Sequence, residues 1–201
     1  MSTIKIVGVC ASPKKTGSTT LFSLEKALDA CRAEGAETVV LNLANYNFGG
    51  CHDCDYCRHK LGCSQKDDFT EKVIPLLSDS SVAGIIFASP VYFGGVTSQM
   101  KAFMDRCVTF RRNGYLLSDM VAGALTVGRS RNGGQELAAM DIVKNGMIQG
   151  MTIVPDAIPT SHFGGNLWSG GPLGVEADEI GIATAVNLGK RVAKTALKLR
   201  Q

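Results

Sequence analysis

Short runs of β-branched and apolar residues alternate along the chain with amphipathic patterns of helical period. The runs predict five buried strands, and the amphipathic segments predict five helices. The strands are expected at residues 4–9, 38–43, 84–88, 121–127 and 151–154, and the helices at about 17–34, 68–78, 97–110, 134–149 and 176–199. Strands that alternate with helices favour right-handed crossovers, so the pattern predicts a parallel sheet with helices on both faces.

Two segments do not follow this alternation. Residues 44–67 break the pattern after the second strand and hold a cluster of cysteines, and residues 156–175 are glycine-rich and are expected to be irregular. A length of 201 residues suits one domain with an inserted loop. Residues 1–201 are therefore expected to form a single domain that carries a cysteine-rich loop at about 44–67.

Composition excludes several classes of protein. A net charge of +3 is too small to indicate a nucleic-acid partner. No apolar run approaches the roughly 20 residues of a membrane span, and the first apolar run is too short for a signal peptide. We therefore expect a cytoplasmic protein without a membrane partner, whose thiols stay reduced.

Ligands of open parallel sheets bind beyond the carboxyl ends of the strands, where the strand order reverses. The loop after the first strand, residues 10–20, lacks the glycine pattern of dinucleotide sites and that of ATP-binding P-loops. It instead offers five hydroxyl side chains and a glycine at a helix N-terminus, which suit a monoester phosphate such as that of FMN. The alternative is plain helix capping, for which one hydroxyl is enough.

Two further loops follow the third and fourth strands. Residues 89–95 place two aromatic side chains and two glycines where a flat ring would lie, although a hydrophobic turn explains them as well. Residues 128–136 are polar, glycine-rich and cationic, and can donate hydrogen bonds to the pyrimidine edge of a flavin. The alternative for this loop is an exposed turn before a helix.

Four of the seven cysteines lie in the run Cys51-x2-Cys54-x2-Cys57-x5-Cys63. This crowding indicates metal or redox chemistry rather than disulfides, and thiolates at such spacing favour an iron-sulfur cluster. Zinc is the second interpretation, but its sites usually pair two cysteine knuckles across a longer gap. Empty thiols are the third. The other cysteines, at positions 10, 31 and 107, are expected in the core.

These motifs together resemble the NAD(P)H-dependent FMN reductase superfamily, and the cysteine loop resembles its iron-sulfur flavoprotein branch. The resemblance rests on Ser12-Pro13-Lys14, Gly17-Ser18-Thr19-Thr20, Ser89-Pro90-Val91-Tyr92 and Gly128 to Glu136. It implies a flavodoxin-like three-layer α/β sandwich with strand order 2-1-3-4-5, and a homodimer or homotetramer.

The resemblance also implies which residues hold the cofactors. The phosphate of FMN would be held by Ser12, Lys14, Ser18, Thr19 and Thr20. The isoalloxazine ring would be lined by Pro90, Val91, Tyr92, Phe93 and Gly94, with Gly128 and Arg129 on its far side. A [4Fe-4S] cluster would be ligated by Cys51, Cys54, Cys57 and Cys63.

The leading hypothesis is an FMN-dependent oxidoreductase that passes electrons between a [4Fe-4S] cluster and FMN, with ferredoxin, NAD(P)H, a quinone or oxygen as outer partners. The alternative is an NAD(P)H-dependent FMN, quinone or azo-type reductase whose cysteine loop is zinc-bound or structural. A redox-sensing module is a third hypothesis. No side chain stands out as a catalytic acid or base. The glycine-rich segment with His162 and Trp168 is expected to cover the flavin or to reach a neighbouring subunit.

Overall fold

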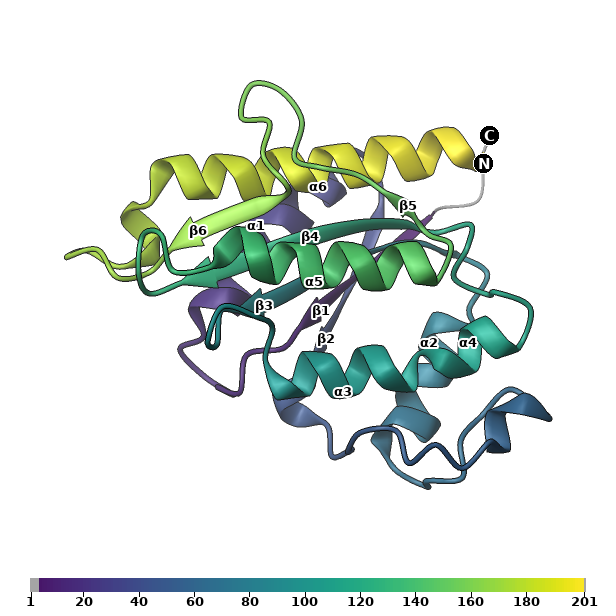
Figure 1. Cartoon of the computed structure of the whole chain (residues 1–201). Coiled ribbons are helices and arrows are strands. Elements are labelled where there is room, and N and C mark those ends of the chain that lie inside the picture. Colours follow the sequence, from purple (N-terminus) through teal and green to yellow (C-terminus); the bar gives the residue numbers. More distant parts are fainter. Residues whose placement is uncertain (1–3, 201) are drawn as a thin grey trace.

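A computed structural model describes residues 4–200, which form a parallel β-sheet with helices on both faces (Figure 1). The strands follow the order β2-β1-β3-β4-β5, as predicted. Their bounds are β1 Lys5–Cys10, β2 Glu37–Asn42, β3 Val82–Pro90, β4 Val121–Gly128, β5 Thr152–Ile153 and β6 Gly165–Trp168. None of the helices in the described part of the chain has the length and apolar character needed to cross a membrane.

The central strands are buried on both faces because helices cover both sides of the sheet. Alternate residues of β1 therefore enter different cores: Ile6 packs with α1 (Thr19–Ala33) and α6 (Glu179–Leu199), whereas Val7 faces the opposite layer. That opposite layer consists of α2 (Ile74–Leu77), α3 (Ser98–Arg106), α4 (Val108–Arg112) and α5 (Gln135–Ile148). Short turns complete the chain: η1 (Leu43–Asn45), η2 (Tyr56–Arg58), η3 (Phe69–Val73) and η4 (Val175–Ala177).

Two of the expected helices are less regular than the sequence suggests. The segment expected at 68–78 begins as the π-helical turn η3 and continues into the short helix α2. The helix expected at 97–110 is divided at Cys107 into α3 and α4. Both irregular segments border the cysteine-rich loop (Figure 1). Phe69 of η3 packs edge to face against Phe103 of α3, with 5.8 Å between the ring centroids.

The expectation of irregular chain throughout 156–175 is wrong at β6. This strand pairs with the carboxyl half of β4, whereas the two-residue β5 pairs with its amino half, so one sheet edge is built from two segments. Gly165 allows the close approach, because a Cβ atom there would lie 3.0 Å from Leu125. The outer amides of β6 are also satisfied: Asn166 N–H donates to Thr184 Oγ1 at 2.9 Å, and Trp168 N–H donates to the Asp178 carboxylate at 2.7 Å.

Candidate functional site

The loops after β1 and β3 lie side by side because their strands are neighbours in the sheet. A buried hydrogen-bond network joins them through Thr97, the N-cap residue of α3. Thr97 Oγ1 donates to the Ala11 carbonyl at 2.9 Å and accepts from Met100 N–H at 3.2 Å. Thr97 N–H donates to Ser89 Oγ at 3.1 Å. The two loops are therefore held in a fixed relation to each other.

The loop after β1 presents backbone amides without protein partners. Ser18 caps α1 by accepting a hydrogen bond from Leu21 N–H at 3.1 Å, and Ser12 Oγ accepts from Lys14 N–H at 3.3 Å. The backbone amides of residues 15–20, by contrast, donate to no acceptor within residues 4–200. Free amides at the start of a helix form a favourable anion site. All five residues expected to hold the phosphate lie in this loop or the first turn of α1.

The loop after β3 ends in a tight turn that exposes its aromatic side chains. Tyr92 and Gly95 exchange two backbone hydrogen bonds of 3.0 and 3.1 Å, and the two residues between them, Phe93 and Gly94, have φ values of 50° and 78°. Such a pair of left-handed residues suits a tight hairpin. The Phe93 side chain is fully exposed and that of Tyr92 is half-exposed, so both are free to contact a ligand.

The loop after β4 contacts this turn and is held closed from within. A Cβ atom on Gly134, whose φ is 98°, would lie 2.9 Å from the Cα atom of Gly94, so only glycine fits there. The buried Gln135 braces the loop: its Oε1 accepts from Gly133 N–H at 2.9 Å, and its Nε2 donates to the Ser130 carbonyl at 2.8 Å. Gln135 belongs to the polar segment 128–136, but the sequence alone does not indicate this bracing role.

Gly128 and Arg129, expected beside the ring, lie at the end of β4 and directly after it. The Arg129 carbonyl accepts a hydrogen bond from Trp168 Nε1 at 2.8 Å, and the guanidinium of Arg131 stacks over the same indole at 4.1 Å. Trp168 therefore holds this loop from the β6 side. The structure brings the residues expected around the flavin to three neighbouring loops at one end of the sheet.

The four clustered cysteines line one small pocket. Cys51 and Cys54 are exposed at its rim, Cys63 is partly buried, and Cys57 is buried. A hydrogen bond with the Ser64 hydroxyl, at 2.9 Å, lowers the pKa of the Cys54 thiol below its ordinary value. Burial has the opposite effect on the cysteines of the core, and raises the pKa of Cys31 to about 12.

The pocket suits a cluster in the number and type of its donors but is narrow. Its volume is about 20 Å³, on the order of the space that one water molecule takes. Within residues 4–200 no group of three or more histidine, cysteine, aspartate or glutamate side chains is arranged to hold a metal ion. An iron-sulfur cluster therefore fits only if the exposed rim with Cys51 and Cys54 moves outward.

Two arginines that sequence reasoning missed border the same pocket. Arg112 donates from Nη1 to Cys57 Sγ at 3.2 Å, and this hydrogen bond raises the pKa of Arg112. Arg106 is fully buried and pairs with Asp67 through two bonds of 2.9 and 3.0 Å. Burial alone would lower the pKa of Arg106, but Asp67, and also Cys63, outweigh it and leave that pKa raised. The pocket thus combines thiols with two guanidinium groups.

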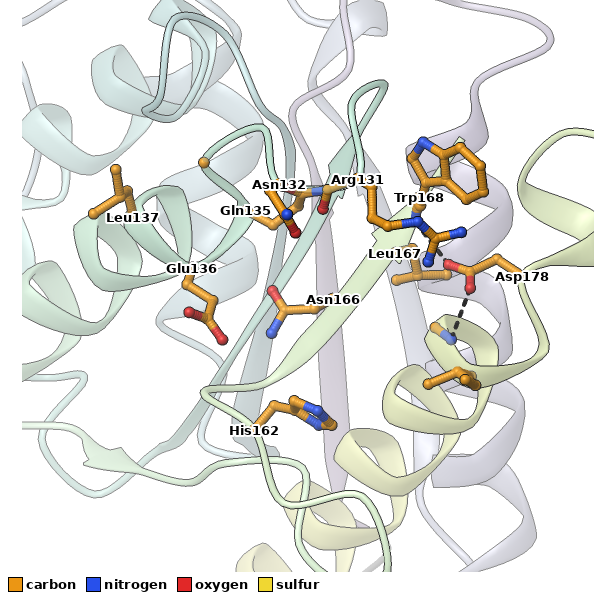
Figure 2. Close-up of a pocket in the computed structure, with 13 residues that line it drawn as sticks. Arg131, Asn132, Gln135, Glu136, Leu137, His162, Asn166, Leu167, Trp168 and Asp178 are labelled. Carbon is orange, nitrogen blue, oxygen red and sulfur yellow. Dashed lines mark hydrogen bonds between the residues drawn. The ribbon is translucent and has the colours of Figure 1, made fainter. Parts of the chain in front are cut away.

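A larger cavity of about 580 Å³ is lined in part by Arg131, Asn132 and Gly134 of the loop after β4 (Figure 2). It is bounded by the start of α5, by β6 and by the start of α6, and none of the twelve residues expected around FMN lines it. His162 points into it, and the His162 ring is held at 3.3 Å by the carboxylate of the fully buried Asp156. The glycine-rich segment therefore contributes to a separate cavity.

Comparison with known proteins gives concordant results. The model of the NADPH-dependent FMN reductase family matches residues 4–165. The chain is 39% identical over 198 residues to an iron-sulfur flavoprotein of Methanocaldococcus jannaschii, covering 98% of this chain and 100% of that protein. It is 36% identical over 196 residues to an iron-sulfur flavoprotein of Methanosarcina thermophila, covering 98% and 93%. A solved flavodoxin-like WrbA-like protein from Agrobacterium tumefaciens shares the fold, with a TM-score of 0.63 at 19% identity, over 98% of this chain and 99% of that one.

Proposed function

This chain belongs to the NADPH-dependent FMN reductase family and is a flavin-dependent oxidoreductase, and from that premise we propose that its FMN exchanges electrons with a [4Fe-4S] cluster. The proposed ligands of the cluster are Cys51, Cys54, Cys57 and Cys63. The observation that carries the proposal is that the fold gathers these four side chains around one pocket. In this proposal the protein is a cytoplasmic homodimer or homotetramer that receives electrons from NAD(P)H or a small carrier such as ferredoxin.

For FMN we propose the three loops at the carboxyl ends of β1, β3 and β4. The amides of residues 15–20, with the hydroxyls around them, would bind the phosphate, and Lys14 would add positive charge. The turn at Phe93 and Gly94 would lie against the ring, with Arg129 on the far side. Bound FMN supplies transfer of one or two electrons, and a cluster supplies transfer of one. The residues of the chain bind and orient these groups, and none is needed as an acid or base.

The direct test is analysis of the protein purified without oxygen. We expect about one FMN, four irons and four acid-labile sulfides per chain. In Cys63→Ser the iron and sulfide should fall while FMN stays bound. Cys31→Ala is a matched control, because Cys31 is a core cysteine far from the pocket in sequence, and this variant should keep its iron. A parent protein with FMN but without iron and sulfide would disprove the cluster.

The second candidate is an NAD(P)H-dependent FMN, quinone or azo-type reductase whose cysteine loop is zinc-bound or structural. The narrowness of the cysteine pocket favours it, because thiols alone fill such a space without any movement of the rim. Zinc without sulfide in the purified protein, together with steady NADPH oxidation in the presence of a quinone, would favour this function. Rapid reduction by ferredoxin would favour the first.

A further inference from the structure

Arg106, the last residue of α3, places a buried cation beside the cysteine pocket. Its side chain is only 1% exposed. Nη1 donates to Asp67 Oδ2 at 2.9 Å and to the Gly49 carbonyl at 3.2 Å, and Nη2 donates to Asp67 Oδ1 at 3.0 Å and to Thr70 Oγ1 at 3.3 Å. A guanidinium has five N–H groups, and these contacts use the four that belong to Nη1 and Nη2.

The fifth N–H group, on Nε, is buried and has no hydrogen-bond partner among the described residues. A buried N–H of a charged group that lacks an acceptor is costly, so its place in the fold requires an explanation. Arg106 is one of the residues that line the pocket of the four cysteines. The nearby hydroxyl of Thr109 is already engaged, since it donates to the Gly62 carbonyl and accepts from the Gly62 amide. The four cysteine sulfurs line the same pocket and can accept a hydrogen bond from this N–H.

We propose that Arg106 is a positioning residue for the metal–thiolate centre, and that its Nε–H donates to the sulfur of Cys63 when this sulfur is a deprotonated ligand. The inference rests on the proposed cluster. Among the four cysteine sulfurs of the run, that of Cys63 is the one without a hydrogen-bond partner in the described part of the chain. Cys51 accepts from Asp53 N–H, Cys54 pairs with the Ser64 hydroxyl, and Cys57 accepts from Arg112. Asp67 fixes the fork of the guanidinium, and Arg106 in turn holds the carbonyl of Gly49, two residues before the first cysteine of the run.

A hydrogen bond to a ligand sulfur changes the properties of a cluster. It withdraws electron density from the sulfur and favours the reduced state, so it raises the reduction potential. An arginine that only anchors the loop would not do this, because its loss would weaken the fold without changing the potential of a loaded cluster. The reduction potential therefore separates the positioning role from simple anchoring.

The first measurement uses the parent protein with arginine labelled by ¹⁵N at Nε only. After anaerobic loading with iron and sulfide and reduction, electron–nuclear double resonance should detect a ¹⁵N nucleus and an exchangeable proton coupled to the cluster. Arg112 does not confuse the result, because it approaches Cys57 through Nη1. A loaded cluster without ¹⁵N coupling overturns the inference while the proposed function stands. A parent protein that takes up no iron and sulfide overturns the proposed cluster and this inference together.

The second measurement uses Arg106→Lys, which keeps the positive charge but cannot reproduce the fork. We expect the cluster potential to shift to a lower value, with the FMN potential of the same sample unchanged. Arg111→Lys is the matched control, because Arg111 is exposed on the neighbouring helix and should leave both potentials unchanged. An unchanged cluster potential in Arg106→Lys overturns the inference. If that variant does not fold, the ¹⁵N measurement on the parent protein decides the inference alone.

Discussion

Replacement of Thr97 by valine tests whether the phosphate loop and the ring loop are held together by the buried network at the start of α3. Valine matches threonine in shape, so Thr97→Val leaves no cavity. It removes Oγ1, and with it the bond to the Ala11 carbonyl and the cap on Met100 N–H. The donation from Thr97 N–H to Ser89 is unaffected, because it uses the backbone.

The expected decrease in the free energy of unfolding follows from the loss of these two hydrogen bonds. A net hydrogen bond contributes about 1 kcal/mol, an N-cap contributes about 1 kcal/mol, and a buried partner left without its bond adds about 1–3 kcal/mol. Thr97 is 2% exposed, so water cannot replace the lost hydroxyl. We therefore expect the free energy of unfolding to fall by about 2–4 kcal/mol. For a chain of this length that corresponds to a decrease in Tm of roughly 4–16 °C. FMN affinity should fall as well, because the phosphate loop loses its anchor at Ala11.

The assay is urea unfolding of the cofactor-free protein, followed by an FMN titration monitored by flavin fluorescence. Thr152→Val serves as the control, because Thr152 is exposed on β5. For an exposed substitution of this kind, the free energy of unfolding stays within about 0.5 kcal/mol of the parent value. If Thr97→Val unfolds at the same urea concentration as Thr152→Val, the network does not stabilise the site and the reasoning is refuted.

Three further predictions concern other parts of the site. Gly134→Ala would bring a Cβ atom to 2.9 Å from the Cα atom of Gly94, at a residue whose φ is 98°. We therefore expect the dissociation constant of FMN to rise at least about tenfold in a fluorescence titration. Unchanged affinity would contradict the close packing of the two loops. Burial alone would raise the pKa of Asp67, but its bonds with Arg106 and Thr70 outweigh this effect and lower it. The contribution of Asp67 to stability is therefore fully present above its ordinary pKa of about 3.9, and it is lost as the pH falls through the lower pKa of the folded state. In Asp67→Asn the free energy of unfolding, measured with urea at a series of pH values, should therefore depend less on pH on the acid side. An unaltered slope would count against the Asp67–Arg106 pair. Burial raises the pKa of Cys31 to about 12, so iodoacetamide at pH 8 should label Cys31 only after denaturation, as peptide mass mapping would show; rapid labelling of the native protein would refute its burial.

The sheet could be predicted from sequence because its central strands are buried on both faces. Every residue of β4 is buried, and such a strand forms a continuous apolar run that is visible in one dimension. β6 could not be predicted in this way. It contains a glycine and an asparagine, and it forms because β4 offers an unpaired edge and because Thr184 and Asp178 satisfy its outer amides. These determinants are distant in sequence.

The same distinction applies to the candidate site. The three loops at the carboxyl edge are continuous segments whose composition indicates their chemistry, so their residues could be named before the structure was known. Arg106 and Asp67 lie far apart in the sequence, and as a helical arginine and a loop aspartate they look like ordinary surface charges. Only the fold brings them together in the interior. The cavity at His162 was also missed, because its walls come from β6 and two helix starts.

The divided sheet edge has a consequence for engineering. Ile153 of β5 pairs with Ala122 of β4, and Gly165 of β6 pairs with Leu125 of the same strand. In the described part of the chain, the segment that connects β5 to β6 does not itself form strand pairs with β4, so its length does not determine the register of either strand. Extra residues, a fluorophore tag or new chain termini introduced near the exposed Ile158 should be accommodated without distortion of the sheet. This position offers a handle for immobilising the protein on an electrode while its cofactor loops stay free.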